Sequence, residues 1–354
     1  LAIQNSCSQL KNMLNCITIR LGYHMTQRAK AFFINGGAGR VLCSIPALEK
    51  YAEENGKDFI IVCEGGTDFF KGHPLLHERA YDHWHKNLFE DKLVNMDIVS
   101  PEPYRVWEYY NQQCSISQAY DIAINNKGVR ELQKPTLKLS NEELFTGFNV
   151  IKEVKEKTKK DKVVVFQPFG RGVQSQNGVI FDPSARSFEG QHVINIIKKL
   201  QKKYAVVLMS EIGIDFAQYG CKDPVAHPQN ISLRQWAAVI AGCNYFLGCD
   251  SVGQHIAYSL DIPATVVTGS TFGVNVTYPN YKKFDVLDMG GDVRRYSPIR
   301  ITMDEVADRG NDGIMIMNDK IEDAIVDSVV KGEAKYKRHD NPGGAIAITT
   351  QAPA

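Results

Sequence analysis

Short apolar runs alternate with segments of helical periodicity along much of the chain. The first run, at 31–35 (AFFIN), is typical of a buried strand, and a glycine-rich loop follows at once at 36–40 (GGAGR). Apolar residues then recur at helical spacing over 41–52 until Gly56, a natural helix stop, and a second apolar run occupies 59–63. This order of strand, glycine loop, helix and strand predicts the opening of a parallel α/β domain.

The second half of the chain repeats the alternation more regularly. Its predicted elements are a strand at 163–167, a helix at 189–203, a strand at 205–209, a helix at 233–240, a strand at 245–248, a helix at 251–260 and a strand at 264–267. Ser232 precedes the second of these helices as an N-cap. The sequence therefore predicts an α/β fold with two doubly wound halves. Ligands of such folds bind at the carboxyl ends of the strands, which here places them in the cleft between the halves.

The length of 354 residues also favours two domains. We predict a non-core extension at 1–24, an N-terminal Rossmann-like domain at 25–152, a C-terminal domain at 153–318, a helix at 319–331 and a loose tail at 332–354. Residues 70–150 show no clear periodicity and are assigned only as the rest of the first domain. The lysine-rich segment 151–162 is interpreted as a solvated connector or helix.

Composition and charge exclude several classes of protein. Hydrophobic residues make up 44% and charged residues 23%, which argues against a disordered or low-complexity chain. The 41 Lys and Arg nearly balance the 40 Asp and Glu, so no chain-wide attraction to nucleic acid or anionic membranes is expected. No apolar run approaches the ~20 residues that cross a bilayer. The eight cysteines form no C-x-x-C pair, which argues against a zinc site or a disulfide framework and favours a cytoplasmic location.

The most specific local motif lies at 248–257 (GCDSVGQHIA), where a strand ends and a helix begins. The unpaired N–H groups and partial positive charge of a helix N-terminus bind phosphate. Ser251 can add a hydroxyl donor, Gly253 lets an anion approach the backbone, and His255 lies one turn further along. The alternative interpretation is structural, with Asp250 or Ser251 capping the helix and His255 packed inside. Spacing alone favours neither interpretation.

Two weaker patterns have ordinary structural interpretations. Four histidines gather at 73–85, and His73 and His77 are four residues apart, as on one helix face. No acidic or cysteine ligand completes an evident metal site there, so we interpret the cluster as a packed or surface helix. The segment 290–295 (GGDVRR) is predicted to be a surface turn.

Several motifs resemble those of the heptosyltransferases of glycosyltransferase family 9. They are, in order, GGAGRVL at 36–42, PAL at 46–48, QPFG at 167–170, ARSF at 185–188, SLRQWAAVI at 232–240, DSVGQHIA at 250–257, LDIPA at 260–264 and GST at 269–271. The resemblance implies a GT-B fold, in which two Rossmann-like parallel-sheet domains face each other across a cleft. It also implies inverting transfer of a sugar from a nucleotide-diphosphate-sugar donor to a hydroxyl of a glycan or lipid-linked acceptor.

The resemblance further implies roles for individual residues. The implied donor-binding set is Gln167, Arg186, Glu211, Asp250, Ser251, Gly253, Gln254 and His255. In this set Ser251, Gly253 and His255 would face the diphosphate, Arg186 would neutralise its charge, and Glu211 would meet the nucleoside. The glycine loop consists of Gly36, Gly37 and Gly39. Protein donors stabilise the leaving diphosphate in this fold, so no metal and no other cofactor is expected.

Arg40 departs from the family pattern, which has an acidic residue at this position as the base that activates the acceptor hydroxyl. Arginine stays protonated and cannot act as that base. We therefore expect Arg40 to contact an anionic acceptor or a donor phosphate. The role of base then passes to Glu64 or Asp68, in the loop after the second predicted strand.

Two alternative functions stay open at this point. Without a base, the chain is a catalytically silent module that binds a nucleotide sugar. The other alternative is a phage-type glycosyltransferase acting on modified DNA, since such enzymes share the GT-B fold. A local basic track of Arg40, Arg294, Arg295 and the lysines of 152–162 would then contact the DNA backbone.

Overall fold

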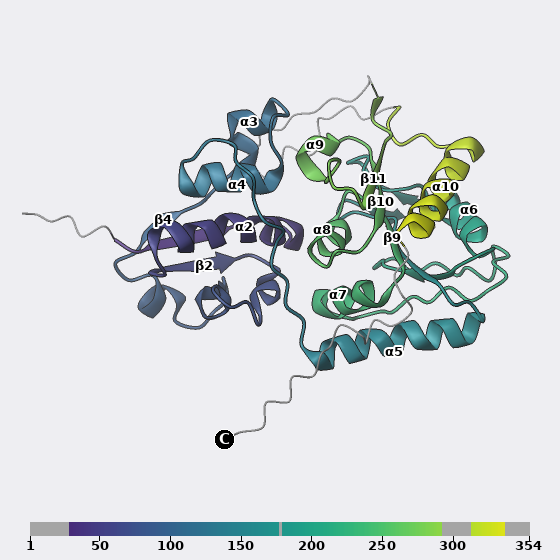
Figure 1. Ribbon diagram of the computed structural model, residues 1–354, viewed down its shortest axis with the longest axis horizontal. Helices are drawn as coiled ribbons and strands as arrows, with labels where there is room; N and C mark the ends of the chain where they lie inside the picture. The colour runs from purple at the N-terminus through teal and green to yellow at the C-terminus, as the bar shows by residue number, and fades with distance from the viewer. Residues whose placement is uncertain (1–27, 177–178, 292–312, 337–354) are drawn as a thin grey trace, which may run out of the picture.

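The computed structural model describes residues 28–176, 179–291 and 313–336, and it shows two α/β domains (Figure 1). The predicted extension at 1–24, Arg294, Arg295 and the tail beyond 336 lie outside the described residues. Both domains contain a parallel sheet, so the predicted fold class is confirmed. In the described part of the chain, no helix is both long and apolar enough to span a membrane.

The N-terminal domain is built on a four-stranded parallel sheet in the order β3-β2-β1-β4. Its elements are β1 (Lys30–Ile34), α2 (Ala38–Asn55), β2 (Phe59–Cys63), η1 (Thr67–Phe70), η2 (His77–Arg79), β3 (Ala80–Asp82), η3 (Leu88–Lys92), β4 (Asp97–Val99), η4 (Pro103–Arg105), α3 (Trp107–Tyr110) and α4 (Ile116–Asn125). The strands β1 and β2 and the helix α2 are as predicted. The strands β3 and β4 were missed because each has three residues, none of them buried, and so leaves no apolar run.

The C-terminal domain contains a five-stranded parallel sheet in the order β11-β10-β9-β5-β8. Its elements are α5 (Asn141–Thr158), β5 (Val163–Gln167), β6 (Gln174–Gln176), β7 (Val179–Phe181), α6 (Gly190–Leu200), β8 (Ala205–Leu208), α7 (Leu233–Gly242), β9 (Tyr245–Cys249), α8 (Val252–Ser259), β10 (Ala264–Thr268), α9 (Gly273–Val276), β11 (Phe284–Asp288) and α10 (Asp319–Lys335). Every strand and helix predicted for this half is present. The small hairpin β6–β7 and the strand β11 were not predicted, and α10 extends four residues beyond the predicted end at 331.

Helix α5 contains the lysine-rich segment and packs on the C-terminal domain. Gly147 approaches α7 so closely that a Cβ there would lie 2.3 Å from the carbonyl carbon of Ala238. Ile151 and Val154 are buried on the same helix. The boundary predicted at 152/153 falls inside α5. The many lysines of this helix indicate a solvated segment, and its few apolar positions leave only a weak signal of packing. The chain crosses between the domains in the irregular segment 126–140.

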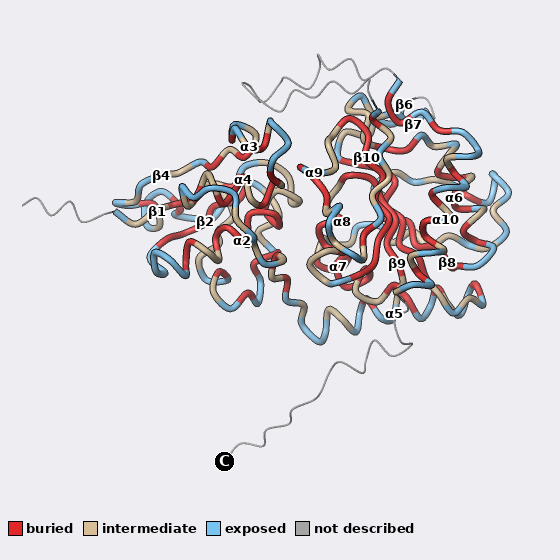
Figure 2. The backbone as a smooth tube through the Cα atoms, turned by 45° about the horizontal axis from the view of Figure 1, so that its top comes forward, coloured by how far each residue is buried: buried red, intermediate tan, exposed pale blue. Residues whose placement is uncertain are grey.

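A continuous cluster of buried apolar side chains includes residues of both domains. Buried positions of the backbone, red in Figure 2, occur in both. It joins Val41 and Leu42 of α2 to Ala237 of α7 and Ile256 of α8. Domains that share an extensive apolar contact have less freedom to move than domains with a small polar interface. The N-terminal ends of α2 and α8 are therefore held at a defined junction.

A buried arginine strengthens this junction. Arg234, in the first turn of α7, is 5% exposed. Its guanidinium donates to both carboxylate oxygens of Glu143 in α5, at 2.5 and 2.6 Å, and to the carbonyls of Asp68, Lys71 and Lys138 at 3.0, 3.2 and 2.6 Å. The hydrogen bonds from Arg234 are the main reason that the pKa of Glu143 is lowered to about 2. The arginine thus links α7 to the N-terminal domain and to the crossing segment.

We predict that Arg234→Ala lowers the free energy of unfolding by roughly 3–5 kcal/mol, because it leaves a carboxylate and three carbonyls without their donor. Urea unfolding measures the change. The control is Lys157→Ala, which removes an exposed pair with Glu153 and should change the stability by less than about 0.5 kcal/mol. Equal losses in the two variants would contradict a special role for Arg234.

Candidate functional site

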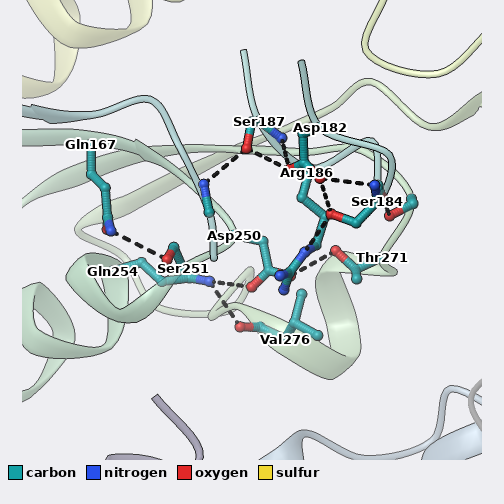
Figure 3. A network of polar contacts seen from close by, with 12 residues as sticks. Gln167, Asp182, Ser184, Arg186, Ser187, Asp250, Ser251, Gln254, Thr271 and Val276 are labelled. Atoms are coloured by element: carbon teal, nitrogen blue, oxygen red, sulfur yellow. Dashed lines mark hydrogen bonds and ion pairs between the residues drawn. The ribbon is translucent and has the colours of Figure 1, made fainter. Parts of the chain in front are cut away.

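The turn between β9 and α8 is supported by a residue from another strand. Gln167, the last residue of β5, donates from Nε2 to Ser251 Oγ at 3.2 Å (Figure 3). Its Oε1 accepts the N–H of Gly253 at 2.8 Å. The side chain of Ser251 makes no capping hydrogen bond of its own. Gln167 therefore supports the start of α8 from beneath, instead of the Asp250 or Ser251 cap considered in the sequence analysis.

Gly253 has a different structural role from the one predicted. Its N–H is bonded to Gln167 and is not left for an anion. A Cβ at this position would lie 2.4 Å from Gln167 Oε1 and 2.6 Å from the ring of Phe246. The glycine is needed so that α8 can pack closely on β5 and β9. The sequence could not show this, because the capping residue lies 86 positions away in the chain.

Asp250 is buried beneath the turn and organises three neighbours (Figure 3). Its Oδ1 accepts from Gln254 Nε2 at 2.8 Å, and its Oδ2 accepts from Thr271 Oγ1 at 2.9 Å. Arg186 Nη1 lies 3.7 Å from the same Oδ2. Asp250 and Gln254, both predicted to bind the donor, thus face one another inside the domain. Asp250 also positions Arg186, whose side chain is 29% exposed.

The loop that carries Arg186 is shaped by Asp182. The carboxylate of Asp182 accepts from the backbone and hydroxyl groups of Ser184 and Ser187. Ser187 Oγ in turn accepts the N–H of Gly170, which brings this loop against the end of β5. Burial acts to lower the pKa of Arg186, but the neighbouring acidic groups, Asp250 first among them and Asp182 with it, together outweigh burial and raise the pKa. Arg186 is therefore a permanent cation at this place.

The glycine loop of the N-terminal domain lies beside a carboxylate. Gly36 has φ +98° and donates its N–H to Glu64 Oε2 at 2.6 Å. Glu64 directly follows β2 and is exposed. Asp68 lies further along, in η1, where its carbonyl accepts from Arg234. Of the two acids predicted as candidate bases, the structure brings Glu64 to the glycine loop.

Arg40 has partners within its own domain. Its Nε donates to Tyr120 Oη at 2.9 Å, and its Nη2 lies 3.3 Å from both carboxylate oxygens of Glu102, which follows β4. The guanidinium also lies over the ring of Tyr104, 4.9 Å from its centroid. Burial opposes the charge, but Tyr120, Tyr104 and Glu102 together raise the pKa of Arg40. Contact of Arg40 with a substrate anion stays a prediction, and Glu102 was missed because it lies 62 residues away.

His255 lies at the contact between the domains and is 7% exposed. Its Nδ1 is 2.8 Å from Tyr278 Oη and 3.4 Å from the Sγ of Cys43 in α2. The Nε2 edge of the ring faces Gly39, where a Cβ would lie 3.3 Å from Cδ2 and 3.8 Å from Nε2. Burial lowers the pKa of His255 to about 4, so the ring is neutral near pH 7. His255 is thus packed at the domain contact, and the packing orients the ring towards the glycine loop, while its predicted contact with a diphosphate stays a prediction.

Arg171 is a site residue to which the sequence analysis gave no role. It lies between Gly170 and Gly172 after β5, and it is exposed. A Cβ at Gly37 would lie 3.4 Å from Arg171 Nη1, so the side chain reaches from the C-terminal domain to the glycine loop. It makes no hydrogen bond or ion pair within the described parts of the chain. An arginine between two glycines at a strand end was the available signal.

Several solved structures share this two-domain architecture. The glycosyl transferase family 9 protein of Veillonella parvula matches with a TM-score of 0.64 at 11% identity, covering 88% of this chain and 98% of that chain. The ADP-heptose LPS heptosyltransferase II of E. coli matches with a TM-score of 0.58 at 14% identity, covering 86% and 99%. The chain has the fold of the family 9 glycosyltransferases. This GT-B fold confirms the resemblance inferred from the motifs.

The iron-containing dodecameric glycosyltransferase TibC of enterotoxigenic E. coli has the same architecture, with a TM-score of 0.53 at 10% identity, covering 86% of this chain and 76% of that chain. No protein-family model matches the sequence, and no curated protein matches it. Among the described residues of this GT-B chain, no three His, Cys, Asp or Glu side chains are grouped as for a metal ion.

The remaining predicted features lie away from the domain junction. Glu211 is exposed after β8 and is followed by Ile212, which lines a pocket of about 900 Å³ formed by the C-terminal domain. His73 is buried, with Nε2 2.9 Å from Glu49 Oε1 and with Nδ1 accepting two backbone N–H groups. His73 therefore packs inside the domain, and in place of the predicted packed or surface helix the segment 73–85 contains the short helix η2 and the strand β3.

The described residues of the predicted DNA track are largely paired with acids. Arg40 pairs with Glu102 inside the N-terminal domain. Four of the lysines in 152–162 have partners: Lys152 with Glu156, Lys157 with Glu153, Lys160 with Asp223 and Lys162 with Glu333. Nothing in this arrangement favours a DNA substrate.

We predict that Gly253→Ala destabilises the protein by about 1–3 kcal/mol, because its methyl group meets Gln167 and the Phe246 ring. Chemical unfolding measures the loss. Gly213→Ala is the matched control, since a Cβ there meets nothing within 4 Å, and it should stay within about 0.5 kcal/mol of the parent protein. If Gly253→Ala keeps full stability, the close packing of α8 is not as described.

Proposed function

We propose that the protein is an inverting glycosyltransferase that uses a nucleotide-diphosphate-sugar donor. The observation that carries the proposal is the position of two cations: Arg171, which is exposed and lies at Gly37 of the glycine loop, and Arg186, which is partly exposed and lies at Asp250 before the start of α8. The GT-B architecture supports the same assignment. In such a reaction the acceptor hydroxyl attacks the anomeric carbon, the bond to the diphosphate breaks, and a base takes the hydroxyl proton.

The donor diphosphate lies between Arg186, Arg171 and the turn at Ser251. Both arginines are permanent cations, and charge-assisted hydrogen bonds to phosphate are about twice as strong as neutral ones. Because Ser251 Oγ accepts from Gln167, its own proton is directed elsewhere and can be donated to a phosphate oxygen. These donors stabilise the negative charge that develops on the leaving diphosphate, and the proposal needs no metal ion.

The nucleoside extends towards the loop after β8. Glu211 lies in that loop and offers a carboxylate that can accept hydrogen bonds from ribose hydroxyls. The neighbouring pocket supplies apolar surface from Ile212 and Ile214 against which the nucleobase can pack. The sugar then points towards the N-terminal domain and the glycine loop.

Glu64 is the proposed base. Its carboxylate is held at the glycine loop by the Gly36 N–H and is exposed, so an acceptor hydroxyl can reach it. Glu102 is a poorer base, since its charge is paired with Arg40. Glu64 thus supplies the carboxylate that Arg40 cannot, which favours an enzyme over a silent binding module. The acceptor we propose is a glycan or lipid-linked saccharide, in line with the named activity of the E. coli heptosyltransferase of similar fold.

We predict that one nucleoside diphosphate, or its sugar, out of ADP, UDP, GDP and CDP raises the melting temperature. At 100 times the dissociation constant the stabilisation is about 2.7 kcal/mol. Arg171→Ala and Ser251→Ala should weaken this binding about tenfold or more, because each removes a donor to the phosphates. Lys152→Ala on α5 is the control and should bind normally. If none of the nucleotides shifts the melting temperature, the donor assignment is wrong.

We predict that Glu64→Gln lowers turnover about 100-fold or more while the nucleotide-induced melting shift stays unchanged, because a general base contributes about 10²–10⁴ in rate. Asp68→Asn is the matched control and should retain activity. Transfer of radiolabelled sugar measures both variants. Full activity of Glu64→Gln would exclude Glu64 as the base.

A further inference from the structure

Two proton-bearing groups face the same nitrogen of His255. Tyr278 Oη is 2.8 Å from Nδ1, and Cys43 Sγ is 3.4 Å from it. Tyr278 follows α9 in the C-terminal domain, whereas Cys43 lies on α2 in the N-terminal domain. Burial raises the pKa of Cys43 to about 12 and raises that of Tyr278 well above its usual value. Both groups are therefore protonated near pH 7.

In the neutral ring of His255, only one of the two nitrogens is protonated. A neutral imidazole carries a single N–H, and the other nitrogen accepts. Cys43 also bonds to Tyr278 and to Ser117, so the thiol proton has other acceptors. The phenol of Tyr278 is the nearer group to Nδ1, and its buried proton is satisfied when Nδ1 is the acceptor. Asp250 is the charged group that acts on His255, and it favours the charged ring, but burial outweighs it. The contacts of His255 therefore decide which tautomer of the neutral ring is present.

We propose that Tyr278 and Cys43 are positioning residues that hold His255 in the tautomer with its proton on Nε2, so that this nitrogen donates a hydrogen bond to the donor diphosphate. The phosphate role of Nε2 rests on the proposed function. The tautomer itself rests on the contacts of Nδ1 alone.

The inference makes the N-terminal domain part of the donor site. Cys43 and Gly39 are four residues apart on α2 and contact the two opposite sides of the His255 ring, its Nδ1 and its Cδ2–Nε2 edge. Residues four apart share one face of a helix. The absence of a side chain at Gly39 lets α2 come against the ring and leaves Nε2 at the glycine loop. The arrangement of the two domains therefore fixes the orientation of a donor-binding group.

The test is the nitrogen spectrum of His255 in protein labelled with ¹⁵N-histidine and free of nucleotide. His255→Gln identifies its signals. We expect a protonated Nε2 and an unprotonated Nδ1 in the parent protein near pH 7, and a mixture of the two tautomers in Tyr278→Phe. Tyr281→Phe is the matched control, because Tyr281 Oη bonds to Asp261 and Lys134 and not to His255. A proton on Nδ1 in the parent protein, or an unchanged tautomer in Tyr278→Phe, overturns the proposal.

Nucleotide affinity separates this inference from the proposed function. With the nucleotide that stabilises the parent protein, Tyr278→Phe should bind several-fold more weakly and Tyr281→Phe should bind normally. A correct tautomer together with no binding of any nucleotide overturns the proposed function and the phosphate role of Nε2, while the positioning by Tyr278 stands. Equal affinity in parent and Tyr278→Phe overturns the link between tautomer and binding.

Discussion

The buried guanidinium of Arg234 is the constraint on which the site depends. It connects the start of α7 to Glu143 of α5 and to carbonyls of η1 and the crossing segment. The same junction is filled by an apolar cluster that continues from α2 to α8. Two domains joined in this way keep the glycine loop opposite the start of α8. A site assembled from both domains is then preorganised and does not have to form when the ligand binds.

Buried polar residues support the groups that lie at the junction of the domains. Gln167 holds the start of α8, and Asp250 holds Gln254, Thr271 and Arg186. Each buried polar group is costly unless it is hydrogen-bonded, so such a network fixes the geometry of its members. Arg186 is held in this way, whereas Arg171 has no described partner and is available to a ligand. The two arginines therefore offer one fixed and one adaptable cation.

The parts of the fold that rest on local pattern could be predicted from the sequence. The buried strands β1, β2, β5, β8, β9 and β10 each appear as an apolar run, and the turn before α8 was located from its glycine and polar residues. The three-residue strands β3 and β4 left no such signal. The candidate site residues could be found from sequence motifs. Their contacts, however, are with partners far away in the chain. Gln167 supports the start of α8 from 86 residues away, and Glu102 pairs with Arg40 across 62 residues. Cys43 contacts His255 across 212 residues. No local pattern encodes such pairs, so the hydrogen bond between Gly253 and Gln167 could not be predicted from the sequence.

At position 40 this chain has an arginine where the family motif has an acidic residue, and the surrounding side chains accommodate the positive charge. An acidic residue expected at this helix position is replaced by a cation, and Glu102 and the rings of Tyr104 and Tyr120 enclose that cation. Burial of an unpaired charge would be strongly unfavourable, so the arginine and its acidic partner form one unit. The carboxylate at the glycine loop then comes from Glu64, on the neighbouring strand end. In the proposed mechanism the base therefore lies at a different position from the one that the family motif marks.

We propose that a nucleotide-diphosphate donor binds at the junction of the two domains. Hydrogen–deuterium exchange, with and without the nucleotide that stabilises the protein, tests this most directly. If the donor binds there, we expect slower exchange of backbone amides on both sides of the junction. The protected segments are the glycine loop at 36–39 and residues 170–172, 184–187 and 250–255. Protection confined to one domain, or to segments away from this junction, would contradict it.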